Sequence, residues 1–315
     1  MRAVVTGAAG FIGSHLCAHL LSHGDDVRGV DAVTDFYDPA RKWENLSPLL
    51  GRDRFTFRQD DLLTAPLEPL FADADAVYHL AGQPGVRSSW GADFALYVER
   101  NILATQRVLE AARDSGLPRL VNASSSSVYG NAETYPTRET ARPGPVSPYG
   151  VTKLAAEHLC ETYRTAFAVP VVSLRLFSVY GPRQRPDMAF SRLLTAAFTR
   201  RPFVLYGDGE QSRDFTYVTD VVTAMRQAAL SSWSGVANVG GGSEVTMNQV
   251  VGLLRLLGAS VQVVRVQGRP GDARRTAADI ALAREAFGYR PTTGVRDGLA
   301  AMVAAARVGR PVPAV

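Results

Sequence analysis

A glycine-rich turn between a strand and a helix constrains the fold of this chain more than any other feature. The apolar run RAVVT at residues 2–6 leads into GAAGFIG at residues 7–13, which opens a helical stretch. In this GxxGxxG pattern, Gly7 permits a tight turn, Gly10 lets the backbone approach a ligand, and Gly13 lets the helix pack against the sheet. Free N–H groups at the helix start favour an anion. The motif therefore predicts a site for the pyrophosphate of a dinucleotide.

Strand-like and helix-like stretches alternate along the first half of the chain. Strands that alternate with helices of about ten or more residues form right-handed β-α-β units and a parallel sheet. We expect an α/β fold with a Rossmann-type, doubly wound parallel sheet in residues 1–177, to which the chain returns at about 214–240. Residues 178–213 and 241–315 should form a smaller C-terminal domain that binds the substrate and caps the cleft.

The hydrophobic pattern places the individual elements of the first half. Beyond residue 177 the pattern becomes looser, and no repeat or low-complexity segment interrupts it. Strands are expected at 2–6, 26–32, 54–62, 73–82, 119–125 and 170–181, and helices at about 11–24, 93–115 and 147–167.

An acidic residue ends the second expected strand. Asp31 follows Gly13 by 18 residues, the usual distance from the turn to the residue that contacts a ribose. A carboxylate there accepts hydrogen bonds from ribose hydroxyls and repels a 2′-phosphate, which favours NAD over NADP. The alternative is that Asp31 is only a solvated loop residue. The strand–turn–helix context together with this acid favours the cofactor site.

The ends of the third and fourth expected strands supply further cofactor contacts. Asp61 and Leu62 are suited to hold the adenine, through the Asp side chain and the Leu backbone N–H. The neighbouring Asp60 is an alternative for the same role. Four more residues are expected to line the cofactor site: Phe11, Ile12, Leu80 and Ala81.

The lysines of the chain are unusually few. Of its 34 Lys and Arg residues, only Lys42 and Lys153 are Lys. We therefore expect each of these lysines to have a role that Arg could not fill. Lys153 lies four residues after Tyr149, which puts both on one helix face. The ammonium can lower the pKa of the phenol and bind the nicotinamide ribose, so that Tyr149 takes a hydroxyl proton during hydride transfer. Ser125, at a strand end, could share the proton relay or bind the reacting oxygen.

Longer segments carry a family resemblance over essentially the whole chain. They are VTGAAGFIGSHL, YHLAGQPGVRSSW, ASSSSVYG, SPYGVTKLAAE, LRLFSVYGPRQRPDMAF, YGDGEQSRDFTYVTD and RPGD. With them the chain resembles the extended short-chain dehydrogenase/reductases, specifically the nucleotide-sugar epimerases and dehydratases. Through GQPGVRSS and GPRQRPDMAF it is most similar to the UDP-glucuronate 4-epimerases. The resemblance implies that bound NAD oxidises C4 of a UDP-sugar to a ketone, that the sugar rotates, and that the hydride returns to its other face.

The resemblance also assigns residues. It implies Ser125, Tyr149 and Lys153 as the catalytic set, and it makes the C-terminal domain a nucleotide-sugar-binding domain. Without the resemblance, each arginine in the motifs would be interpreted as a solvated surface residue. The substrate contacts that it implies are Arg213 and Arg269 at the diphosphate, Asp272 at the nucleotide ribose, and Arg87 at the sugar–diphosphate region.

The residues after Ser125 indicate which reaction is excluded. Related 4,6-dehydratases carry an Asp-Glu pair after the catalytic hydroxyl residue, and the decarboxylases carry Glu at the position of Ser127. This chain has Ser126 and Ser127, so it lacks the acid that dehydration or loss of CO2 requires. We expect Ser126, Ser127, Ser178 and the cation Arg185 to hold a C6 carboxylate. The alternative is that the serines line a pocket for a neutral C6 hydroxymethyl group.

Three functions follow from these observations. The first is an NAD-dependent epimerase that interconverts UDP-glucuronate and UDP-galacturonate without decarboxylation. The second is a UDP-glucose or UDP-N-acetylglucosamine 4-epimerase. The third is a non-catalytic NAD-sensing protein, which would have no need of Tyr149 and Lys153.

Composition argues against other classes of function. The formal charge is +4 with a pI of about 9.2, and no run of five like charges occurs, so no nucleic-acid partner is expected. Nothing approaches eighteen consecutive apolar residues, and the N-terminus runs straight into a strand, so we expect neither a membrane span nor a signal peptide. No metal is expected at the site.

The two cysteines and the helix faces bear on location and assembly. Cys17 and Cys160 cannot form a disulfide scaffold, and both are expected to be buried in a reduced, cytoplasmic protein. In relatives, helices equivalent to 93–115 and 149–167 pair into a four-helix bundle, which implies a homodimer. The alternative is that these apolar faces pack inside the monomer.

Overall fold

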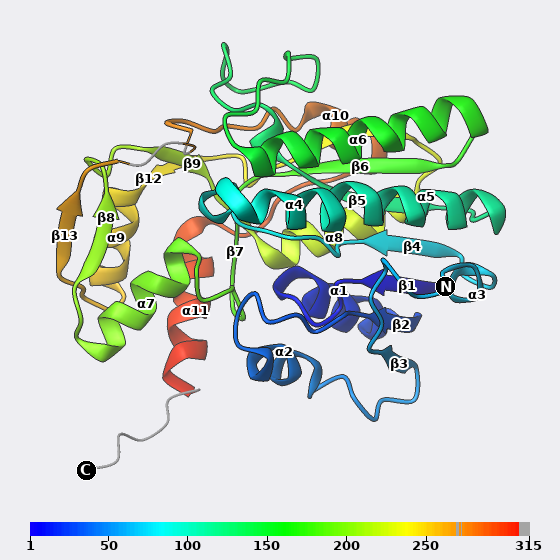
Figure 1. Cartoon of the computed structure of the whole chain (residues 1–315). Coiled ribbons are helices and arrows are strands. Elements are labelled where there is room, and N and C mark those ends of the chain that lie inside the picture. Colours follow the sequence, from blue (N-terminus) through cyan, green and yellow to red (C-terminus); the bar gives the residue numbers. More distant parts are fainter. Residues whose placement is uncertain (269–270, 272, 309–315) are drawn as a thin grey trace.

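Seven parallel strands form the centre of the molecule (Figure 1). The computed structural model describes residues 1–268, 271 and 273–308. The sheet contains β1 (Arg2–Thr6), β2 (Asp26–Val30), β3 (Phe55–Arg58), β4 (Ala76–His79), β5 (Leu120–Ser125), β6 (Val171–Leu176) and β11 (Gly235–Val239). Their spatial order is β11-β6-β5-β4-β1-β2-β3, so the order reverses between β1 and β4. This confirms the predicted α/β, Rossmann-type, doubly wound fold.

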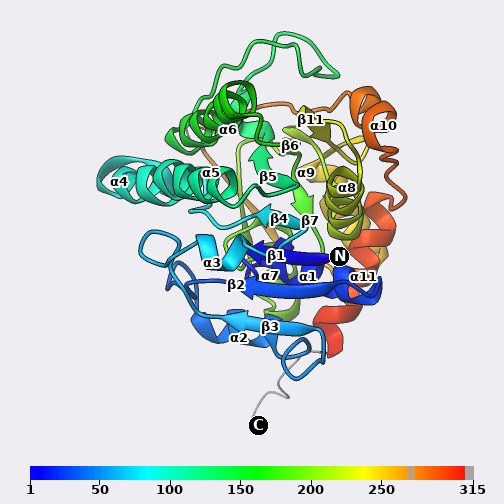
Figure 2. The ribbon, with the colours of Figure 1, turned by 90° about the vertical axis from the view of Figure 1, so that its right-hand side faces the viewer.

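Helices cover both faces of the sheet (Figure 2). Those that share a core with one face are α1 (Phe11–Ser22), α8 (Val218–Leu230) and α10 (Ala281–Phe287). Those on the other face are α3 (Glu68–Phe71), α5 (Ala104–Asp114) and α6 (Pro148–Phe167). Because both faces are covered, β4, β5 and β6 are buried along their whole length instead of alternating between buried and exposed residues.

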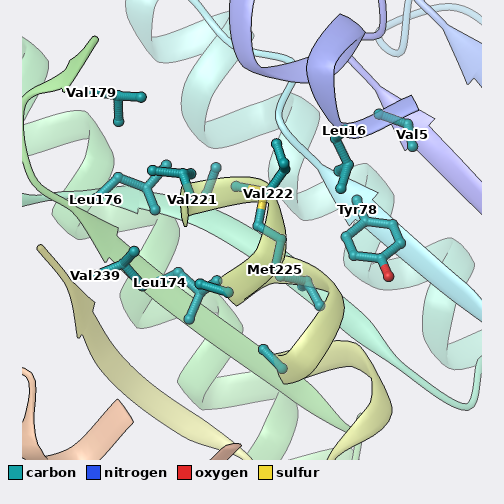
Figure 3. Packing of buried hydrophobic residues seen from close by; sticks show 14 of the residues in the cluster. Val5, Leu16, Tyr78, Leu174, Leu176, Val179, Val221, Val222, Met225 and Val239 are labelled. Atoms are coloured by element: carbon teal, nitrogen blue, oxygen red, sulfur yellow. The ribbon is translucent and has the colours of Figure 1, made fainter. Parts of the chain in front are cut away.

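Successive strand residues enter the two cores in turn. In β1, Val5 belongs to the core under α1 and α8, whereas Val4 belongs to the core under α5 and α6. This follows from the two-residue period of a strand. Figure 3 shows Leu16 of α1 and Met225 of α8 in the first of these cores, where they are grouped with strand residues such as Tyr78.

The C-terminal part forms smaller sheets and a third core. Its strands pair as β8 with β13, β9 with β12, and β7 with β10. Phe190, Leu254 and Leu299 are buried in its core. The elements are β7 (Val179–Tyr180), α7 (Ala189–Thr199), β8 (Phe203–Tyr206), β9 (Ser212–Asp214), β10 (Thr216–Tyr217), β12 (Glu244–Thr246), α9 (Met247–Leu256), β13 (Val263–Val266) and α11 (Val295–Val308).

The chain leaves the sheet and returns to it. Strand β11 follows β7 to β10 in the sequence and pairs in parallel with β6 of the central sheet. The division into domains at 1–177, 178–213, 214–240 and 241–315 stays a prediction.

Several elements differ from the sequence expectation. The helix expected at 93–115 is divided into α4 (Phe94–Tyr97), the π-helical turn η3 (Val98–Leu103) and α5. The strand expected at 170–181 is split into β6 and β7. Two short helices, α2 (Pro39–Leu46) and α3, were not expected at all. Within the described residues, no helix has the length and apolar character needed to span a membrane.

A buried ion pair fixes α6 on the sheet. Arg175 of β6 binds Glu157 of α6 through three hydrogen bonds: Nη2 to Oε1 at 2.6 Å, Nε to Oε2 at 3.0 Å, and Nε to Oε1 at 3.2 Å. Their side chains are 6% and 3% exposed. Ser124 of β5 donates to the same carboxylate at 2.7 Å, and Arg175 also donates to the Tyr129 hydroxyl. These bonds hold α6 in one register against β5 and β6.

We predict that Glu157→Ala destabilises the protein by about 3–5 kcal/mol, because it leaves the Arg175 charge buried without a counterion. Urea unfolding measures this loss. Glu161→Ala is the matched control on the same helix, since Glu161 pairs with Arg164 at the surface, where such a pair contributes about 1 kcal/mol or less. Equal losses in the two variants would contradict the prediction.

Candidate functional site

A cavity of about 1040 Å³ opens at the carboxyl ends of the strands. It begins where the strand order reverses, between β1 and β4, which is the usual ligand crevice of such a sheet. From there it runs to the C-terminal part, where Arg192 of α7, Leu205 of β8 and Met247 of α9 line it. One continuous space therefore joins the predicted cofactor end to the predicted substrate end.

The glycine turn forms one end of this cavity. Gly7 has a φ of +73°, and a Cβ on it would lie 2.8 Å from the backbone nitrogen of Ala81. A Cβ on Gly13 would lie 2.8 Å from the carbonyl carbon of Gly7 and would collide with its oxygen. No described side chain caps the start of α1, so its first N–H groups are open to an anion. The predicted residues that line the cavity here are Gly7, Gly10, Phe11, Ile12, Gly13, Leu80 and Ala81.

Asp31 lies beside the glycine turn and is held by it. Its Oδ2 accepts a hydrogen bond from the Ala9 N–H at 3.0 Å, and its Oδ1 accepts one from the Val33 N–H at 2.7 Å. Each carboxylate oxygen keeps a second lone pair for a ribose hydroxyl. The backbone therefore orients the carboxylate before any ligand binds.

The predicted adenine contacts also line the cavity. Asp61 and Leu62 both lie on its wall, and so does Asp60. Asp61 accepts a hydrogen bond from the Leu63 N–H at 2.9 Å, whereas Asp60 pairs with Arg58 at 2.8 Å. The choice between the two acids stays open.

The predicted catalytic side chains come together from two elements. Helix α6 begins at Ser147, whose hydroxyl accepts from the Gly150 N–H at 3.1 Å, so Tyr149 lies in its first turn and Lys153 one turn later. Ser125 ends β5, and its side chain is near enough to Tyr149 to lower the pKa of the phenol. Gly150 permits this approach, because a Cβ there would lie 2.6 Å from the Ser127 carbonyl oxygen. All three catalytic candidates line the cavity.

Burial controls the proton affinities of these groups. It raises the pKa of the Tyr149 phenol, while the Ser125 side chain and the charge of Arg185 lower it in part. Burial also lowers the pKa of Lys153 to about 8. Ser125 and Arg185 contribute to lowering the pKa of the phenol, and the effect of Lys153 on it stays a prediction. Of the pair on α6, Lys153 titrates nearer to neutral pH.

The predicted carboxylate contacts lie at the same end as Tyr149. Ser126 and Ser127 occupy the short 3-10 turn η4 (Ser126–Val128) after β5, and they line the cavity with Ser178 and Arg185. Arg185 already binds a carboxylate, because its Nε and Nη2 contact the two oxygens of Asp187 at 3.0 and 2.9 Å. A substrate carboxylate would therefore share or replace this partner.

The remaining arginines lie toward the C-terminal part. The Arg87 guanidinium stacks over the Tyr206 ring, 4.4 Å from its centre, and Arg213 of β9 donates to the Ser212 carbonyl at 2.8 Å. Both line the cavity. Arg269 and Asp272 lie outside the described residues.

A buried polar chain that the sequence did not reveal supports the centre of the site. Asn101, in the π-helical turn η3, accepts from the Gln83 N–H at 2.7 Å and donates to Thr152 Oγ1 at 3.0 Å. Its carbonyl accepts from Thr105, whose hydroxyl contacts His79 at 3.0 Å. Burial lowers the pKa of His79 to about 3, so it is a neutral member of this chain. These bonds link α5, α6 and the end of β4.

Comparison with known proteins identifies the family. The NAD dependent epimerase/dehydratase family matches residues 3–240. The chain belongs to this family.

In the described residues, no group of three or more His, Cys, Asp or Glu is placed to hold a metal ion. The uncapped start of α1, the glycine contacts and the oriented Asp31 fit the pyrophosphate and ribose of NAD.

Individual relatives share nearly the whole chain. An uncharacterized UDP-glucose epimerase, YtcB of Bacillus subtilis, is 44% identical over 95% of this chain and 96% of its own length. The UDP-glucuronate 4-epimerase of Thermodesulfobacterium geofontis is 35% identical over 94% of this chain and 93% of its own. The Bacillus cereus UDP-glucuronic acid 4-epimerase, solved with UDP-glucuronic acid and NAD, is 42% identical with a TM-score of 0.94, covering 98% and 99% of the two chains.

We predict that Gly13→Ala lowers both the bound NAD content and the melting temperature, because the new Cβ forces α1 away from the Gly7 carbonyl. Cofactor extraction and thermal unfolding measure the two effects. Gly252→Ala is the matched control: it lies within helix α9 with open space around it, so the change should stabilise by about 0.5–1 kcal/mol. Wild-type NAD content in Gly13→Ala would contradict the prediction.

Proposed function

We propose that the chain is an NAD-dependent UDP-sugar 4-epimerase whose preferred substrate pair is UDP-glucuronate and UDP-galacturonate. The observation that carries this proposal is the meeting of Ser125, Tyr149 and Lys153 in one cavity, between the glycine turn and the serine-lined turn η4. The non-catalytic alternative does not account for a buried lysine and a tyrosine on one helix face beside Ser125. The B. cereus relative, solved with UDP-glucuronic acid and NAD, supports the same substrate class.

In this proposal the chain moves one proton in each direction. Tyr149, ionised to the phenolate, takes the proton of the C4 hydroxyl, and Ser125 and Arg185 assist that ionisation because they lower the pKa of the phenol. Lys153 provides a positive charge on the same face of α6 and binds the nicotinamide ribose. NAD, which the glycine turn and Asp31 would hold, would supply the acceptor for the C4 hydride and its return to the opposite face of the sugar. Tyr149 then gives the proton back, so no net oxidation occurs.

The serine turn explains why the carboxylate is retained. Oxidation at C4 of a glucuronate creates a β-keto acid, which readily loses CO2. The hydroxyls of Ser126, Ser127 and Ser178 can donate hydrogen bonds to the carboxylate, and Arg185 adds a cation. The turn after Ser125 holds no carboxylic acid to protonate C5. The site therefore favours return of the hydride over loss of CO2.

The nucleotide part of the substrate is assigned to the far end of the cavity. We propose that Arg87 and Arg213, which line it there, bind the diphosphate region. Arg269 and Asp272 complete this proposed set at the diphosphate and the nucleotide ribose.

One observation favours a second candidate, a UDP-glucose 4-epimerase. Arg185 already has a carboxylate partner in Asp187, so this cation has a counterion without a uronate. A neutral hydroxymethyl group would then need only the serine hydroxyls. MoeE5, which is 42% identical with a TM-score of 0.87, has been solved with UDP-glucose and NAD, and also with UDP-glucuronic acid and NAD, so it is compatible with both candidates.

We further propose that the enzyme is a cytoplasmic homodimer. Exposed apolar side chains lie on α4, η3 and α6, where Phe94 is 38%, Leu103 48% and Val151 46% exposed. Helices α5 and α6 lie side by side on one flank of the sheet (Figure 2). A second copy that packs on this flank would cover these side chains.

The substrate assignment predicts that UDP-glucuronate is converted to UDP-galacturonate without release of CO2. Incubation with UDP-glucuronate, UDP-glucose and UDP-N-acetylglucosamine in turn, with product analysis by NMR, tests this. Activity confined to the uncharged sugars would select the second candidate instead.

The catalytic assignment predicts that Tyr149→Phe keeps NAD but loses at least about a hundredfold in kcat, because the proton acceptor is gone. Tyr163→Phe is the matched control on the same helix. Tyr163 is not among the cavity-lining residues and bonds to Glu110, so its kcat should equal that of the wild type. Unchanged turnover in Tyr149→Phe would remove Tyr149 from the mechanism.

A further inference from the structure

Lys42, the lysine that the proposed mechanism does not use, lies on a helix face that packs on the glycine turn. Lys42 and Asn45 are three residues apart on α2, so they share one side of the helix. Asn45 donates a hydrogen bond to the Ala9 carbonyl at 3.0 Å, inside the glycine turn. Helix α2 lies beside α1 in the fold (Figure 1). This brings Lys42 to the cofactor end of the cavity.

The Lys42 ammonium is buried with too few partners. The residue is only 6% exposed, yet it lines the cavity. Its Nζ donates to Thr34 Oγ1 at 3.1 Å and lies 5.1 Å from the centre of the Tyr37 ring. In the described part of the chain no carboxylate forms an ion pair with it, although Asp31 acts on it at longer range. An ammonium carries three donors, so two remain available.

A buried charge without a counterion costs free energy, so this ammonium requires a polar or anionic partner. Burial lowers the pKa of Lys42, which shows the cost of keeping it charged. A further acceptor can reach the ammonium from the cavity that Lys42 lines, and Asp31 and the start of α1 line the same cavity. This is where the ribose and phosphates of the ADP half of NAD are expected.

We propose that Lys42 is a cofactor-binding residue whose ammonium donates to an oxygen of the ribose–phosphate part of the ADP half of NAD. Asp31 then accepts hydrogen bonds from the ribose hydroxyls, while Lys42 donates one to a neighbouring oxygen. The ribose–phosphate region is thus bound by an anionic acceptor and a cationic donor. Helix α2 becomes the element that retains the cofactor.

The composition agrees with this assignment. Every other basic residue except Lys153 is Arg, including Arg100, whose charge also reaches Lys42. A guanidinium is larger and carries five donors in a rigid fork, which this nearly closed position could not satisfy. A compact ammonium suits a single oxygen acceptor.

The test replaces Lys42 by Met, which keeps the length of the side chain and removes the charge. We expect Lys42→Met to bind NAD about 10- to 100-fold more weakly, the loss of one charged hydrogen bond, and to release NAD during dialysis. Isothermal titration of NAD into dialysed protein measures the affinity. The stability of the protein without NAD should not fall, because a buried charge is replaced by an apolar group. Arg41→Met, an exposed neighbour on the same helix, is the control and should bind NAD as the wild type does.

Further titrations identify the acceptor. If Lys42 contacts a phosphate, Lys42→Met weakens binding of ADP but not of adenosine; if it contacts the ribose, both weaken. Either result supports the proposal. NAD affinity within twofold of wild type in Lys42→Met, or an equal loss in Arg41→Met, overturns it. The proposal rests on NAD being the cofactor, and failure of the wild type itself to bind NAD would refute that assignment instead.

Discussion

The close contact between the backbones of Gly7 and Gly13 is the constraint on which the rest of the structure depends. It brings the start of α1 onto the end of β1, where the strand order of the sheet reverses. The same turn is held from two more sides, because Asp31 accepts from the Ala9 N–H and Asn45 donates to the Ala9 carbonyl. The turn is therefore rigid before a ligand arrives, which lowers the entropy that binding must overcome.

The catalytic end is made rigid by a different device. Helix α6 carries Tyr149, Lys153 and Glu157 at successive four-residue steps, so one face of one helix holds both the reacting groups and their anchor. The anchor is the buried pair of Glu157 with Arg175, and Ser124 joins it directly before Ser125. A fixed helix allows a lysine and a phenol to be held out of water, where their proton affinities move away from the ordinary values.

The sequence predicted the parts of the site that depend on local geometry. The glycine turn, Asp31 and the Tyr149–Lys153 spacing each follow from one strand end or one helix turn, and the structure places all of them in the cavity. Asn101 was missed because its position depends on a π-helical turn stabilised by distant partners, Gln83 and Thr152. The rarity of lysine pointed to Lys42 but gave it no role, since only folding brings α2 to the glycine turn. The helix α2 itself is too short for its periodicity to be read.

The choice between a uronate and a neutral sugar reduces to a competition for Arg185. Its partner Asp187 has a side chain that is 42% exposed, so this carboxylate can return to water at little cost. The Arg185 side chain is only 19% exposed and its charge reaches Tyr149. A substrate carboxylate that replaced Asp187 would therefore pair with Arg185 inside the cavity, farther from water than Asp187 is. A neutral sugar would leave the Arg185–Asp187 pair in place and gain only the serine hydroxyls. Preference for a uronate thus depends on the difference in free energy between the Arg185–Asp187 pair and a more buried pair of Arg185 with the substrate carboxylate. Hydrogen bonds from the serine hydroxyls add to this preference, because a carboxylate accepts them more strongly than a neutral hydroxyl does.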